Sequence, residues 1–136
     1  MIAAVSFFWL LQKWLEPQAL KFKDSNPVTV CCTPNFNKTH FYYKAVGFSM
    51  VPTIKDNFII ECIKVNFNEL KVGDIVNYKP QWNNYKLTCH RLVMKDKYGF
   101  IASGDNNMYS ESFERITEDN YVNKVIVIYV TNNFSS

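Results

Sequence analysis

The chain has 136 residues, enough for one domain with a real hydrophobic core. Hydrophobic residues make up 48% and charged residues 20%, a balance that excludes a disordered chain. The formal net charge is only +3 and the lysines are scattered, so we expect no nucleic-acid partner.

The first fifteen residues, Met1 to Leu15, are rich in Trp, Phe and Leu. A proline at Pro17 disfavours helical geometry for Glu16, so we predict an apolar helix over residues 1–16. This helix is shorter than the roughly 20 apolar residues that span a membrane. Its aromatic content favours a helix lying in the membrane interface, and a helix packed on the core or on a partner is the alternative.

Residues 17–38 are polar and are broken by Pro27 and Pro34, which predicts an irregular connector with one short strand over 28–32. From residue 39 onward, short runs of β-branched and aromatic residues alternate with turn residues such as Asp and Asn. This spacing predicts a mainly β domain over 39–136, folded as a sandwich or barrel. The expected strands are 40–46, 58–64, 75–78, 86–94, 99–102 and 122–130.

The four cysteines do not form a C-x-x-C pair, so the spacing of a zinc ribbon is absent. We expect neither a metal nor a cofactor. Cys31 and Cys32 are adjacent, which disfavours a bridge between them. Buried free thiols are preferred over a disulfide from this pair to Cys62 or Cys89.

Three stretches carry residues that suit nucleophilic catalysis. Ser49 lies between a glycine and a proline directly after an apolar, strand-like run, where a tight turn can hold its hydroxyl. A serine needs a neighbouring base, and His90 is the right type because its unperturbed pKa is near 6.5. Asp105, in a turn, could orient the imidazole. Each residue taken alone is more often an ordinary turn or core residue, and only the conjunction indicates an active site.

Four motifs in this order are similar to those of type I signal peptidases, and in particular to the Ser–His branch found in the endoplasmic reticulum and in archaea. They are Ser49-Met50-Val51-Pro52-Thr53, Gly73-Asp74-Ile75-Val76, His90-Arg91 and Gly104-Asp105-Asn106-Asn107.

The resemblance implies a signal-peptidase-like β fold and a serine endopeptidase that removes signal peptides from preproteins after small residues. It implies that Ser49 is the nucleophile, His90 the general base and Asp105 the third member. It also implies a membrane-associated protein whose catalytic domain lies on the lumenal or extracytoplasmic side, with accessory subunits as possible partners.

The sequence departs from the family pattern at several positions. Glu111 stands where the Ser–His branch often has a second aspartate, so Asp105 and Glu111 both remain candidates for the third member, with Asp105 preferred. Gly47 replaces a serine that can help to hold the oxyanion, which leaves backbone N–H groups for that role. The residues expected to shape the substrate cleft are Phe48, Met50, Pro52 and Ile54.

Other readings stay open. His40, Lys44 and Lys86 are rival bases, and Cys89, as a strand neighbour of His90, should point to the opposite face and pack in the core. Alternative functions are a self-cleaving peptidase of the repressor kind, which uses a Ser–Lys pair, and a non-catalytic binding module that keeps the fold.

Overall fold

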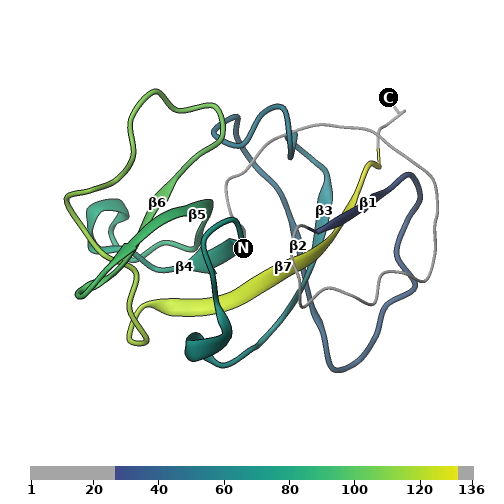
Figure 1. Ribbon diagram of the computed structural model, residues 1–136. Coiled ribbons are helices and arrows are strands. Elements are labelled where there is room, and N and C mark those ends of the chain that lie inside the picture. The colour runs from purple at the N-terminus through teal and green to yellow at the C-terminus, as the bar shows by residue number, and fades with distance from the viewer. Residues whose placement is uncertain (1–26, 132–136) are drawn as a thin grey trace.

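A computed structural model describes residues 27–131, and the predicted helix over 1–16 lies outside these residues, as do residues 17–26 of the predicted connector. Within residues 27–131, two 3-10 helices, η2 (Phe67–Glu69) and η3 (Gln81–Asn83), lie between successive strands (Figure 1). The part of the chain from 27 to 131 contains no helix that is long and apolar enough to cross a membrane. The strands are β1 (Val28–Val30), β2 (Phe41–Lys44), β3 (Ile59–Ile63), β4 (Ile75–Tyr78), β5 (Thr88–Asp96), β6 (Gly99–Ser103) and β7 (Tyr121–Tyr129).

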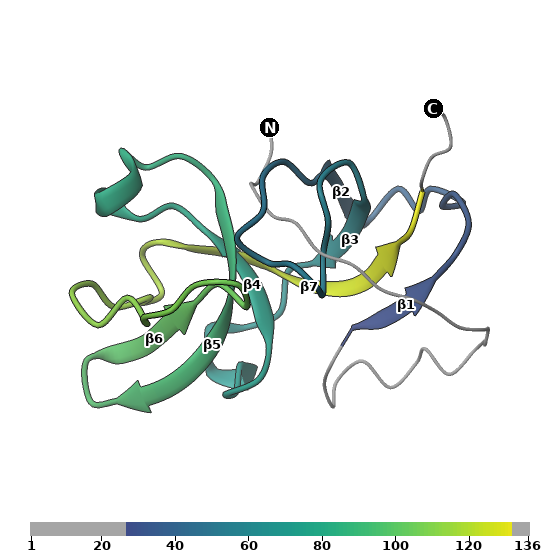
Figure 2. The same cartoon turned by 90° about the horizontal axis from the view of Figure 1, so that it is seen from above.

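The strands form one sheet in the order β2-β3-β7-β4-β5-β6, and β1 adds to β7 in parallel. The mainly β prediction is therefore confirmed, and each expected strand has a counterpart in the structure. The N-terminal part of β7 pairs with β4 and its C-terminal part pairs with β3. Figure 2 shows the result: β7 runs from the half that contains β4, β5 and β6 into the half that contains β1, β2 and β3.

The core divides into two apolar clusters because successive residues of a strand point to opposite faces of the sheet. On β4, Ile75 belongs to one cluster and Val76 to the other. On β5, Cys89 is fully buried in the cluster of Ile75, while His90 stands opposite Val76 and so shares the other face. The prediction that Cys89 packs in the core, away from His90, is confirmed.

All four cysteines are free thiols. Cys62 and Cys89 are buried, and burial raises the pKa of both thiols well above the usual range. Cys31 and Cys32 are exposed, so the expectation of burial is wrong for this pair. They follow β1 directly, on a segment that the core does not cover.

A buried ion pair fixes the start of β4 against β7. Lys124 Nζ lies 3.3 Å from Asp74 Oδ1, and the two side chains are only 4% and 1% exposed. The second oxygen of Asp74 accepts a hydrogen bond of 2.9 Å from the backbone N–H of Lys71. Removing one partner of such a pair leaves a buried charge with neither a counter-ion nor solvent. The resulting loss of stability is larger than the net stability that the intact pair contributes.

We predict that Lys124→Met lowers the free energy of unfolding by about 3–5 kcal/mol, because the carboxylate of Asp74 then stays buried without its cation. The double variant Lys124→Met, Asp74→Asn should recover a large part of this loss, because the amide carries no charge. Urea denaturation of the full chain measures both values. Equal stability of wild type and Lys124→Met would contradict the structural role of the pair.

Candidate active site

The turn that carries Ser49 follows β2 and is closed by its own backbone. Gly47 has a φ of +100°, a left-handed conformation that glycine adopts without strain. The N–H groups of Thr53 and Ile54 both donate to the carbonyl oxygen of Met50, at 2.8 and 2.9 Å. The Met50 side chain is completely buried, so the residue after Ser49 anchors the turn in the core. Ser49 itself is only partly buried.

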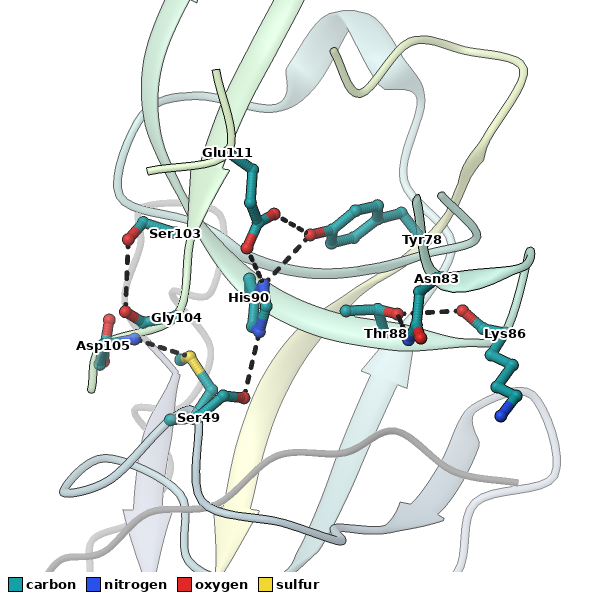
Figure 3. Close-up of polar contacts among 11 residues, drawn as sticks. Ser49, Tyr78, Asn83, Lys86, Thr88, His90, Ser103, Gly104, Asp105 and Glu111 are labelled. Carbon is teal, nitrogen blue, oxygen red and sulfur yellow. Dashed lines mark hydrogen bonds and ion pairs between the residues drawn. The ribbon is translucent and has the colours of Figure 1, made fainter. Parts of the chain in front are cut away.

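His90 meets this turn from β5. Its Nε2 lies 3.1 Å from the Oγ of Ser49 (Figure 3). The imidazole comes from β5, which lies between β4 and the edge strand β6, and His90 is only 3% exposed. The two residues that the sequence predicted as nucleophile and base are therefore brought within hydrogen-bonding distance by the fold.

The other ring nitrogen of His90 faces Glu111 and Tyr78. His90 Nδ1 lies 2.7 Å from Glu111 Oε2 and 3.1 Å from the hydroxyl of Tyr78, which donates to Glu111 Oε1 at 2.5 Å. Burial, followed by the charge of Glu111, raises the pKa of Tyr78 well above its usual range, so its phenol stays a donor. Because the carboxylate only accepts, Nδ1 must carry the proton. The neutral ring then presents the lone pair of Nε2 to Ser49.

The contact of Tyr78 with His90 follows from strand register. Val76 is the direct partner of His90 across the β4–β5 pair, and Tyr78 lies two residues further along β4. Residues two apart share a face, so Tyr78 becomes a diagonal neighbour of His90. Sequence reasoning did not identify Tyr78, because the contact depends on the register between two strands.

Asp105 does not face His90 but is paired with Arg91, which corrects the preference for Asp105 over Glu111 as the neighbour of His90. Two nitrogens of Arg91 donate to the two oxygens of Asp105 at 2.8 and 2.7 Å, and the Thr53 hydroxyl also donates to Asp105. The hydrogen bonds with Asp105 raise the pKa of Arg91. Arg91 follows His90 on β5, so its side chain leaves the other face of the strand and draws Asp105 there.

The Gly104–Asn107 turn instead holds the turn of Ser49. Asn106 donates from its backbone to the carbonyl oxygen of Ser49 at 2.8 Å and from its side chain to the carbonyl oxygen of Phe48 at 3.1 Å. A Cβ atom at Gly104 would lie 2.6 Å from that same Ser49 oxygen, so the close approach requires glycine. Asp105 and its neighbours thus position the serine.

The residues expected to shape the substrate cleft divide into two groups. Phe48 is 69% exposed beside Ser49, and Pro52 is also exposed. Met50 and Ile54 are fully buried in the core, which corrects the prediction that they present a surface to a substrate. The physical reason is that the turn folds back on itself, so that both side chains point into the core and hold the turn against it.

The rival bases lie elsewhere. His40 is paired with Glu61 of β3, with 2.5 Å between His40 Nδ1 and Glu61 Oε2. Lys86 lies in the loop before β5, and Figure 3 shows its side chain well away from Ser49. Lys44 is exposed at the end of β2.

Comparison with known proteins agrees with this architecture. A family model described as Peptidase S24-like matches residues 16–126, which is most of the chain. Neither a comparison with curated proteins nor one with solved structures gives a match. Because this family model matches most of the chain, the chain belongs to the Peptidase S24-like family.

Proposed function

We propose that this protein is a serine endopeptidase in which Ser49 is the nucleophile, His90 the general base and Glu111 the residue that orients the base. The observation that carries the proposal is the hydrogen-bonded line from Ser49 Oγ through the two nitrogens of His90 to Glu111. A weak nucleophile, a base within reach and a third group that orients the base form the general signature of a hydrolase triad.

The geometry supports a complete acyl-transfer cycle. As Ser49 Oγ bonds to the scissile carbonyl carbon, its proton passes to Nε2 of His90. The negative charge that develops on the carbonyl oxygen is met by backbone N–H groups of the Ser49 turn. The proton on Nε2 then passes to the leaving amine as the peptide bond breaks. Water attacks the resulting ester by the same route, its proton goes to Nε2 and returns to Ser49 Oγ, and the carboxylic acid is released.

Glu111 acts on the base throughout this cycle. While His90 is neutral, Glu111 holds the proton on Nδ1 and keeps Nε2 free to accept. When His90 is protonated, the carboxylate compensates the charge of the imidazolium. Tyr78 keeps the carboxylate in this orientation by donating to its second oxygen.

Within this class we propose removal of signal peptides from preproteins after small residues. The support is the order of the four sequence motifs and their resemblance to signal peptidases of the Ser–His branch. The substrate would bind as an extended strand against the edge of the sheet next to Ser49, with the exposed Phe48 beside it. The apolar residues from Met1 to Leu15 support an association with the membrane, on the lumenal or extracytoplasmic side, with or without accessory subunits.

We predict that the purified chain cleaves a model preprotein in detergent after a small residue. Ser49→Ala and His90→Ala should each lower kcat by roughly 10⁴- to 10⁶-fold, because nucleophile and base act as one unit. Product masses and initial rates measure both effects. Cleavage of the chain itself at a rate that does not depend on its concentration, with no cleavage of the preprotein, would favour the self-cleaving alternative. A folded but inactive wild type would favour the binding module.

Glu111→Gln should lower kcat by about 10⁴-fold with little change in KM, because the amide tolerates the wrong tautomer of His90. Asp105→Asn serves as the comparison, since it leaves Glu111 in place and disturbs only the support of the Ser49 turn. We expect a smaller loss of kcat for it. Full activity of Glu111→Gln together with complete loss in Asp105→Asn would reassign the third member to Asp105.

A further inference from the structure

Trp82 covers the ring of His90. The two ring planes are nearly parallel, at 13°, and their centroids lie 6.2 Å apart, the geometry of an offset stack. Trp82 is 40% exposed, whereas His90 beneath it is 3% exposed. The indole therefore lies between one face of the imidazole and the solvent.

A carboxylate fixes the backbone that presents this indole. Trp82 lies in η3, and the backbone N–H groups of Gln81 and Trp82 donate to the two oxygens of Glu114 at 2.8 and 2.9 Å. The loop is tied to β5 as well, because the Asn83 side chain donates to the hydroxyl of Thr88 at 2.9 Å (Figure 3). Two sets of hydrogen bonds, to Glu114 and to Thr88, thus fix the loop that carries Trp82, and neither involves the indole ring.

The segment that holds Trp82 is the segment that carries Glu111. Three residues after Glu111, Glu114 binds the backbone of η3, and between them the ring of Phe113 meets Trp82 edge to face, at 6.3 Å between centroids and 85° between planes. The short segment 111–114 therefore acts on His90 in two places. It contacts Nδ1 directly, and it supports Trp82, which lies against the face of the ring.

We propose that Trp82 is a positioning residue for His90, held in place by Glu114. This inference rests on the proposed function of His90 as a base. The hydrogen bonds at Nδ1 fix the direction of the ring within its plane, but they leave it free to tilt about that axis. Contact with the indole face opposes the tilt and excludes water from that side of the ring. A base that is mispositioned by a fraction of an ångström loses rate without losing substrate affinity.

The first test separates kcat from KM for preprotein cleavage. We expect Trp82→Ala to lower kcat by about ten- to a hundredfold with KM nearly unchanged, and Trp82→Phe to stay close to wild type, because a second aromatic face can replace the indole. Tyr98→Ala, which removes an exposed aromatic ring at the far end of the β5–β6 hairpin, is the matched control and should leave both constants unchanged. A rise in KM alone would overturn the proposal and make Trp82 a substrate contact.

The second test asks whether Glu114 acts through Trp82. Glu114→Ala should lower kcat by itself, and the double variant Trp82→Ala, Glu114→Ala should lose no more than Trp82→Ala alone. Losses that multiply in the double variant would show that Glu114 works independently of the indole, and that part of the proposal would fail.

A third test needs no substrate, so it separates failure of this inference from failure of the proposed function. The chain has only two histidines, and His40→Gln identifies the resonances of His90. Nuclear Overhauser contacts between the ring protons of His90 and the β-protons of Ser49 report the position of the imidazole. They should be strong in wild type and in Trp82→Phe, and weak in folded Trp82→Ala. Equal intensities in all three would overturn the positioning role, whether or not the protein cleaves preproteins.

Discussion

The site depends on one constraint, the hydrogen bonding of His90 Nδ1. The carboxylate of Glu111, which can only accept, lies within hydrogen-bonding distance of this nitrogen, so Nδ1 must carry a proton. The lone pair of the neutral ring is then left at Nε2, which faces Ser49. Under the proposed mechanism, any change that frees Nδ1 lets the ring turn or change tautomer, and Ser49 then loses its base even though its own turn is intact.

The sheet supplies this constraint through one pair of strands and two loops. The register of β4 with β5 places Tyr78 and His90 on one face, and β7 supports β4 from its other side. The chain after β6 then contributes two acidic residues with different contacts. Asp105 is paired with Arg91 and supports the serine turn, whereas Glu111 contacts Nδ1 at the edge of the imidazole. Ser49 and His90 are thus held by two separate parts of the segment that connects β6 to β7.

The strands could be predicted from sequence because their apolar and β-branched runs are local and end at clear turn residues. The proximity of Ser49 and His90 could be predicted because the motifs around them stand in the same order as in the family that the sequence resembles. Which of Asp105 and Glu111 lies beside His90 could not be predicted, because both are acids in the same loop and their placement depends on which face of β5 carries Arg91. Their nearness to Ser49 in the sequence predicts that Met50 and Ile54 lie at the cleft, but the turn folds both side chains into the core. Trp82 gave no signal, since stacking on His90 depends on a loop held by Glu114.

The central claim is that the contact with His90 makes Ser49 a nucleophile. The most direct measurement is reaction of the full chain with a small fluorophosphonate, followed by mass spectrometric mapping of the labelled residue. Such a reagent needs no substrate cleft and reacts only with an activated hydroxyl. The account predicts one label, on Ser49, formed in wild type and absent in His90→Ala. Labelling of Ser49 at the same rate in folded His90→Ala, or no label on Ser49 in wild type, would contradict it.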